Sequence, residues 1–247
     1  MKIEVKGIVI KEVELNNGNR LIHILTDQLG VVTAILNNIS FRKSNKFSSI
    51  HVLAYCKFML FKRKEYYYVD EFEVLSIFWE TKDDLKILAV CQYFCELCLI
   101  LSPESTVSGE FLKVFLNSVF FISKKIKDLR LIKIIFEMKS LSLCGYMPNL
   151  ICCYKFKKYD SVVMIFLIDS GKIICDDCWS NSNNEQYIQV NKGMLRALRH
   201  IIYSPVEKIF SFELSNDALG ILSELSENYT IYHLGTNFKS LEFYKRL

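Results

Sequence analysis

The fold of the N-terminal part is decided by residues 50–75, which read IHVLAYCKFMLFKRKEYYYVDEFEVL. Two runs rich in aliphatic and aromatic residues, Ile50 to Phe61 and Tyr66 to Leu75, flank the polar tip Lys62-Arg63-Lys64-Glu65. Residues of these types favour the half-buried surface of a sheet, and a short polar tip between two such runs is typical of a β-hairpin. The stretch therefore predicts two paired strands with cations at their turn.

Three further strands are predicted upstream of this hairpin. Ile3 to Val13 alternates apolar and polar residues, and Gly7 lies inside the run, as at a bulge or a barrel corner. Arg20 to Thr26 and Val31 to Leu36 flank the turn sequence Asp27-Gln28-Leu29-Gly30. Five short strands within about 80 residues favour a small β-barrel.

The apolar pattern changes to a helical period beyond residue 80. The predicted helices are Thr81 to Leu101, Gly109 to Ile122, Asp128 to Leu143, Lys192 to Tyr203 and Ser215 to Tyr229. Between the third and fourth helices lies the apolar run Ser161 to Ile168, which predicts a buried strand. We therefore expect an α+β protein with one domain at residues 1–80 and a second at residues 81–247.

Composition bounds the class of protein. The chain has 247 residues, of which 51% are hydrophobic, so we expect a folded core and not disorder. The net charge of +4 does not by itself predict a nucleic-acid partner. Ser161 to Ile168 is much shorter than the roughly 20 apolar residues of a membrane span, and the N-terminus has strand alternation in place of a signal peptide. We expect a cytoplasmic protein whose nine cysteines are reduced thiols or metal ligands.

The basic residues of the N-terminal part gather in a span that contains no acid. Between Gln28 and Lys64 there is no Asp or Glu, and three tyrosines, Tyr66 to Tyr68, follow directly. Cations that hold phosphates beside rings that stack on bases suit single-stranded nucleic acid. A solvated basic loop beside ordinary strand tyrosines is the alternative. The basic residues of the span are Arg42, Lys43, Lys46, Lys57, Lys62, Arg63 and Lys64.

A second basic region overlaps the third predicted helix. Six cations stand there with only two acids, Asp128 and Glu137. The cations would extend an electropositive surface, or they would form the polar face of an amphipathic helix. They are Lys124, Lys125, Lys127, Arg130, Lys133 and Lys139.

One pair of cysteines has metal-binding spacing. Cys175-x-x-Cys178 is typical of a zinc knuckle, in which two thiolates of one tight turn bind one metal. The same spacing serves thiol exchange, but redox pairs of that kind usually stand at a helix N-terminus, whereas a polar loop sequence follows here. Upstream, Cys152 and Cys153 are adjacent and do not form a second pair of this spacing.

The other chemistry-bearing residues predict packing and not catalysis. Cys91, Cys95 and Cys98 share one face of the first predicted helix and are expected in the core. The sequence has no phosphate-binding loop, dinucleotide fingerprint, nucleophile elbow or zinc-protease motif. The histidines, which have no ligand spacing among them, are His23, His51, His200 and His233. We therefore expect no enzymatic activity.

Short stretches in a fixed order carry a resemblance across nearly the whole chain. They are KGIVIK at residues 6–11, NRLI at 19–22, LTDQLG at 25–30, FRKS at 41–44, LCGYMPNL at 143–150, CDDC at 175–178, LRALR at 195–199, YHLG at 232–235 and KSL at 239–241. In their order and spacing the sequence resembles the RecO family of bacterial recombination mediators.

The resemblance implies an OB-fold barrel, then a helical domain with a zinc-knuckle-like insertion at about residues 146–186. It implies a mediator that binds and anneals DNA strands and helps load a recombinase in recombinational repair, in the bacterial cytoplasm at the nucleoid. Its implied partners are single- and double-stranded DNA, a RecR-like protein and the tail of single-stranded-DNA-binding protein, with no membrane. An OB-fold adaptor without direct DNA binding is the alternative. The candidate DNA-binding residues are Arg20, Arg42, Lys43, Lys46, Lys62, Arg63 and Lys64.

The resemblance also implies a metal site, and this chain departs from the family pattern at one of its ligand positions. A four-cysteine knuckle of the family would place ligands at Cys153, Cys175 and Cys178, but its remaining position falls on Phe156. Cys152 is a substitute fourth ligand if Zn²⁺ is bound. The alternative is a metal-free knuckle held by apolar packing, which we expect from Ile151, Phe156, Ile173 and Trp179.

Overall fold

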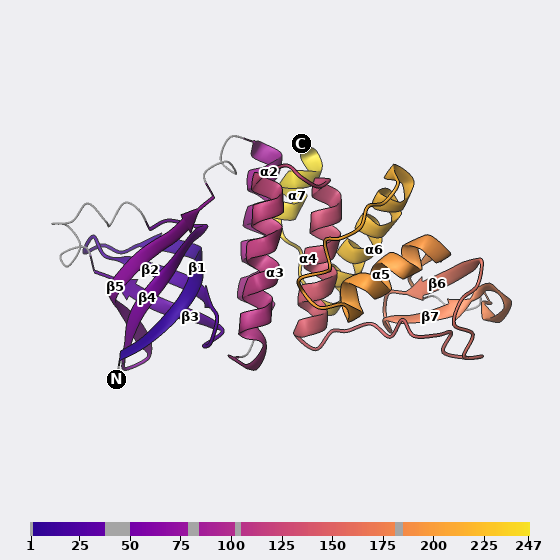
Figure 1. The fold of residues 1–247 in the computed structure, drawn as a ribbon, viewed down its shortest axis with the longest axis horizontal. Coiled ribbons are helices and arrows are strands. Elements are labelled where there is room, and N and C mark those ends of the chain that lie inside the picture. The colour runs from indigo at the N-terminus through magenta and orange to yellow at the C-terminus, as the bar shows by residue number, and fades with distance from the viewer. Residues whose placement is uncertain (1, 38–49, 79–83, 102–104, 181–184) are drawn as a thin grey trace. The chain divides into compact units, whose positions relative to one another are not determined.

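The computed structural model describes residues 2–37, 50–78, 84–101, 105–180 and 185–247 (Figure 1). By its internal contacts the chain divides into two compact units. Met1–Lys124 and Phe238–Leu247 make up the first, and Lys125–Asn237 makes up the second. This division groups helices with the barrel, and the domain boundary near residue 80 stays a prediction of the sequence.

Five strands of the first unit form a closed barrel in the order β1-β2-β3-β5-β4 (Figure 1). Neighbouring strands pair antiparallel, except that β3 and β5 pair parallel and close the barrel. The predicted barrel is confirmed. The strands are β1 Lys2–Glu14, β2 Arg20–Thr26, β3 Val31–Leu36, β4 Ala54–Arg63 and β5 Tyr66–Ile77.

The barrel core is apolar and closely packed around Gly7. A Cβ at Gly7 would lie 2.6 Å from Cγ2 of Ile24 and 2.8 Å from the carbonyl oxygen of Leu25, so only glycine lets β1 approach β2 this closely. The irregular pairing of β1 falls between Val9 and Lys11, so Gly7 itself is a close-approach position and not the bulge. Alternate residues of the strands, among them Ile22, Ile24, Phe58 and Leu60, point inward and are fully buried.

The helices of the first unit are α2 Leu85–Leu101, α3 Ser105–Ser123 and α7 Lys239–Arg246. Asp84 begins α2 by accepting a hydrogen bond from the backbone N–H of Lys86, while Thr81 lies outside the described residues. The thiols of Cys91, Cys95 and Cys98 are buried in α2, as predicted. Burial raises the pKa of Cys91 to about 12, which keeps this thiol neutral and unreactive.

The second unit combines three helices with a small sheet. Its elements are α4 Leu129–Leu143, β6 Val163–Leu167, β7 Lys172–Cys175, the short 3₁₀-helix η4 Asp176–Cys178, β8 Tyr187–Asn191, α5 Lys192–Tyr203 and α6 Asn216–Leu234. The sheet has the order β7-β6-β8, and its central strand β6 is the predicted buried strand. Asp128, Asn191 and Ser215 cap the starts of α4, α5 and α6 with their side-chain oxygens.

The basic residues around α4 do not form one exposed face. Lys133 is fully buried and its Nζ lies 3.1 Å from a carboxylate oxygen of Glu137. Lys139 is also buried, and its Nζ donates hydrogen bonds to the carbonyl oxygens of Ile202 and Ser204. Both interpretations, an electropositive surface and the polar face of an amphipathic helix, are therefore wrong for these two lysines, because α4 packs between other helices of the second unit. None of the described helices is both long and apolar enough to span a bilayer.

Candidate nucleic-acid interface and metal centre

The tip of the β4–β5 hairpin carries a short run of exposed cations. Arg63 pairs with Tyr66 at the ends of the two strands, and Lys64 begins the turn with a positive φ of 56°. Lys62, Arg63 and Lys64 are all exposed. Cross-strand pairing fixes the backbone of Lys62 and Arg63 at the end of β4, next to Lys64 in the turn, and the side chains of Lys62 and Arg63 leave opposite faces of the strand.

The three tyrosines of β5 have different surroundings. Tyr66 is 43% exposed at the hairpin tip. Tyr67 packs against the barrel core, with Nζ of Lys62 5.8 Å from its ring centroid. Tyr68 stacks on Phe61 with ring centroids 5.4 Å apart. Tyr66 is therefore the ring of this group that is best placed to receive a base.

Arg20 occupies a different setting from the hairpin cations. Its side chain is only 11% exposed, and Nη1 lies 2.6 Å from Oε1 of Glu12. The same nitrogen donates to the carbonyl oxygen of Ile50 at 2.7 Å. These contacts tie β1 and β2 to Ile50, the first residue of the described range 50–78. Arg42, Lys43 and Lys46 lie outside the described residues.

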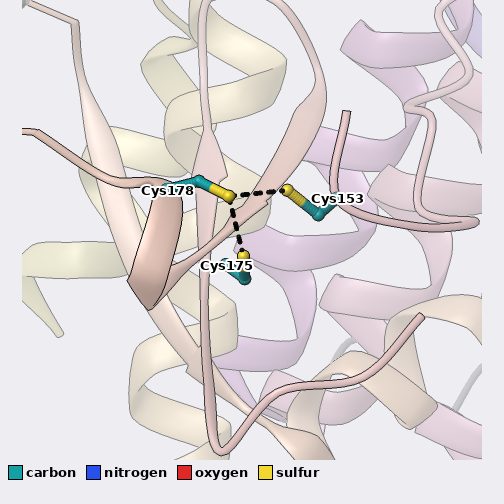
Figure 2. A group of neighbouring side chains, drawn as sticks. All are labelled: Cys153, Cys175 and Cys178. Carbon is teal, nitrogen blue, oxygen red and sulfur yellow. Dashed lines mark hydrogen bonds between the residues drawn. The ribbon is translucent and has the colours of Figure 1, made fainter. Parts of the chain in front are cut away.

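Three thiols of the second unit converge on one point. Figure 2 shows the side chains of Cys153, Cys175 and Cys178 directed toward one another, and their sulfur atoms all lie within 4.8 Å. Sγ of Cys178 is 3.7 Å from that of Cys153 and 3.1 Å from that of Cys175. Cys175 ends β7, Cys178 ends η4, and Cys153 directly precedes the turn at residues 154–156. The predicted pair Cys175 and Cys178 thus forms a cluster with Cys153, one of the two adjacent cysteines upstream.

Backbone N–H groups favour the ionised form of one of these thiols, that of Cys153. Burial would raise the pKa of Cys153, but the N–H groups of Phe156, Cys175 and Lys155 point at its sulfur and lower the pKa to about 7. Burial and the two neighbouring sulfurs instead raise the pKa of Cys178 to about 12. One thiolate among three close sulfurs is a donor set that suits a thiophilic metal ion.

One of the two short sulfur–sulfur distances fits a tetrahedral metal site, and the other, 3.1 Å between Cys175 and Cys178, is shorter than such a site requires. Bonds of about 2.3 Å to a tetrahedral zinc place sulfurs about 3.8 Å apart, which agrees with the distance between Cys153 and Cys178. Cys152 is half-buried and is not one of the clustered thiols. Among the described residues, the cluster therefore supplies three ligands and could bind a metal with one position open.

The expected apolar substitute core is wrong for two of its four residues. Phe156 is 77% exposed and Ile151 is also exposed, so neither packs inside the knuckle. Ile173 is buried in β7, and the ring of Trp179 lies against that of Tyr187 with centroids 4.7 Å apart and planes tilted by 55°. The knuckle therefore lacks the packing of Phe156 that would replace a metal.

A buried arginine that the sequence analysis did not single out anchors the knuckle. Arg199 of α5 donates to the carbonyl oxygens of Leu150, Ile151 and Tyr159 and pairs with Asp160 at 2.8 Å. It lies within the stretch LRALR at residues 195–199. Helical spacing predicts its burial, because it shares the buried face of α5 with Leu195 and Leu198, but does not predict its distant partners.

Two family models cover almost the entire chain. The model described as "Recombination protein O N terminal" matches residues 1–78, and "Recombination protein O C terminal" matches residues 82–242. A "DNA repair protein RecO" from Acetivibrio thermocellus is 30% identical over 99% of this chain and 97% of its own length. Proteins of the same name from Clostridium acetobutylicum and Clostridium perfringens are 25% and 27% identical, over 96% and 98% of this chain and 94% and 97% of their own lengths. The chain belongs to the RecO family of DNA repair proteins.

Proposed function

We propose that this chain is a DNA-binding mediator of recombinational repair that anneals complementary strands and helps load a recombinase. Membership of the RecO family supports the role in repair. The single observation that carries direct DNA binding is the exposed tip of the β4–β5 hairpin, where three consecutive cations stand beside an open tyrosine ring. Phosphates would pair with the cations and a base would stack on Tyr66.

The basic loop at residues 41–46 extends this proposed interface. Arg42, Lys43 and Lys46 bring three more cations from a span without acids. Arg20 takes a positioning role in the proposal, because its guanidinium already holds Glu12 and the backbone of Ile50. It would thereby fix the start of the chain segment that follows the loop.

The proposed reaction is assembly without bond chemistry. Annealing needs only that two strands be held together while bases pair, so we propose that it proceeds without a nucleotide or any turnover. A RecR-like protein and the tail of single-stranded-DNA-binding protein are the proposed protein partners, on the resemblance to the family alone.

Zn²⁺ is the metal we propose for the thiol cluster. Cys153, Cys175 and Cys178 would hold it, and the ion would cross-link the segment at Cys153 to the 3₁₀-helix η4 that ends at Cys178. The role is structural, since a cross-link between two loops stabilises the fold of a small insertion that has little core of its own.

Paired variants of the barrel test the DNA interface. Lys62→Ala/Arg63→Ala should weaken binding of a single-stranded oligonucleotide regardless of base sequence and lower the salt slope by about 1.4, at about 0.7 per lost phosphate contact. Lys2→Ala/Lys57→Ala is the matched control, because it removes two barrel cations that already pair with Asp70 and Glu4. Equal slopes for both variants would contradict the proposed interface.

The loop is tested separately. Arg42→Ala/Lys43→Ala/Lys46→Ala should lower the slope by about 2 in a protein that still folds. If wild type and all variants bind DNA without salt dependence or not at all, the alternative of an adaptor that contacts only proteins is favoured.

A further inference from the structure

A pocket of about 390 Å³ lies on the second unit, and none of the three clustered cysteines lines it. One wall is α5, which contributes Arg196, His200 and Tyr203. The other wall is the chain segment that leads through the knuckle, which contributes Ile151 and Tyr159. None of these groups belongs to the barrel interface proposed above.

The walls of this pocket are fixed by hydrogen bonds. The guanidinium of Arg199 lies 3.9 Å from the ring centroid of Tyr159 and supports one face of that ring. The hydroxyl of Tyr203 accepts the backbone N–H of Leu150 at 3.1 Å, which joins α5 to the opposite wall. His200 is held between the carbonyl oxygen of Lys208 and the hydroxyl of Ser204. The pocket is therefore preorganised and not a transient gap.

The groups of the pocket that remain available to a ligand are the rings of Tyr159 and Tyr203 and the guanidinium of Arg196. Tyr159 is 59% exposed, and Tyr203 and Ile151 are also exposed. Arg196 is exposed, and in the described part of the chain no carboxylate forms an ion pair with it. Of the basic residues of α5 and residues 151–160, Lys158 pairs with Asp177, and Lys192 and Arg199 pair with Asp160. Arg196 is therefore the cation of the pocket that is available to an anion.

The backbone of the pocket favours a nucleotide over a peptide. An extended peptide docks chiefly through main-chain hydrogen bonds. Here the carbonyl oxygens of Leu150, Ile151 and Tyr159 all accept from Arg199. The N–H of Leu150 is also used, by Tyr203. A nucleotide of a single strand needs only a ring for its base and a cation for its phosphate, which are the groups this pocket offers.

We infer that this pocket binds one nucleotide of single-stranded DNA, with the base against Tyr159 and Tyr203 and the phosphate at Arg196. The inference rests on the proposed DNA binding of the chain and extends the contacts of the strand to the second unit. It assigns Arg196 as a binding residue and Arg199 as a positioning residue that acts through Tyr159.

Separate variants of the whole 247-residue chain test the charge of Arg196 and the stacking of a base on Tyr159. Arg196→Ala should lower the salt slope for a single-stranded oligonucleotide by about 0.7, whereas Lys239→Ala, which removes an exposed cation of α7, should leave it unchanged. Tyr159→Ala should weaken binding roughly fivefold to hundredfold without altering the slope, as expected for a lost stacking contact. Tyr159→Phe keeps the ring and should bind as the wild type does.

Photocross-linking gives a readout that does not depend on the stability of any variant. An oligonucleotide that contains 5-iodouracil should cross-link the wild-type protein within tryptic peptides 159–172 or 200–208, which contain Tyr159 and Tyr203. Cross-links confined to the barrel, together with unchanged binding by Arg196→Ala and Tyr159→Ala, would overturn the inference.

Two further outcomes separate this inference from its alternatives. If Lys62→Ala/Arg63→Ala weakens binding while the pocket variants do not, the barrel interface stands and the pocket inference alone fails. If Arg196→Ala abolishes binding of a fluorescent hexaglutamate peptide and leaves oligonucleotide binding intact, the pocket takes an acidic peptide and the inference is overturned.

Discussion

The sulfur atoms of Cys153 and Cys178 lie 3.7 Å apart although 25 residues separate them along the chain. Cys175 completes the cluster at 3.1 Å from Cys178. No disulfide is formed between these free thiols, so the two turns that carry them are brought together by the surrounding fold. Such a convergence of thiols brings together the donor atoms of a metal site.

The first prediction is the metal content of the protein. Protein purified without a chelator should contain about one zinc per chain, because three close thiols favour a thiophilic ion. Cys175→Ser/Cys178→Ser should lose the zinc, whereas Cys152→Ser should retain it, since Cys152 lies outside the cluster. Absence of zinc from the wild type, with the same Tm before and after chelator, would show that the knuckle is held by packing alone.

The second prediction concerns the open position of the site. Phe156→Cys should complete a four-thiolate set and raise zinc affinity at least about tenfold, since closed structural sites have four ligands. The wild-type side chain is exposed, so this substitution removes little packing. Competition with a chromogenic chelator measures the affinity. Equal affinities of wild type and variant would mean that position 156 does not face the metal.

The third prediction concerns the buried ion pair of α4. Lys133→Met should lower the free energy of unfolding by about 3–5 kcal/mol, because Glu137 and Glu227 lose the ammonium group that neutralises them in the interior. Lys86→Met, at an exposed position of α2, should change it by less than about 0.5 kcal/mol. Urea titration of both variants measures the difference, and equal stabilities would mean that Lys133 is not buried as described.

The fourth prediction is a pH dependence set by Asp160. Hydrogen bonding to Arg199 holds the pKa of Asp160 below its ordinary value of 3.8, and Lys192 acts in the same direction. A carboxylate with a depressed folded-state pKa stabilises the fold above its unfolded pKa, near 4, and this stability is lost as pH falls through the folded-state value. Asp160→Asn should therefore be less stable than the wild type at pH 7, with a gap that narrows below pH 4. A gap of constant size from pH 7 to pH 2 would exclude this linkage.

The sequence predicted the barrel and most helices because their signals are local. Alternating runs and polar turns marked all five strands, and Asp128 and Ser215 marked the starts of α4 and α6. The strands β7 and β8 and the helix α7 were missed, since each is short. Contacts between residues far apart in the chain could also not be predicted from the sequence. The burial of Lys133 and the anchoring role of Arg199 depend on partners about 40 to 90 residues away.

Only the charged residues of the candidate nucleic-acid interface could be predicted from the sequence. The cation run at Lys62 to Lys64 could be read directly, and the hairpin does present it to solvent. The different surroundings of Tyr66 and Tyr68 could not be read, because they follow from which face of β5 meets the core. Arg20 resembled the other cations in sequence, and only its contacts with Glu12 and Ile50 distinguish it.

The most direct test of the account is the salt dependence of the affinity of the intact wild-type protein for a short single-stranded oligonucleotide. If the six cations of the hairpin tip and the basic loop contact phosphates, the logarithm of the affinity should fall with the logarithm of salt concentration with a slope of about −4, at about 0.7 per contact. Tight binding that does not change between low and high salt, or no binding at low salt, would contradict the claim that the barrel binds DNA through these residues.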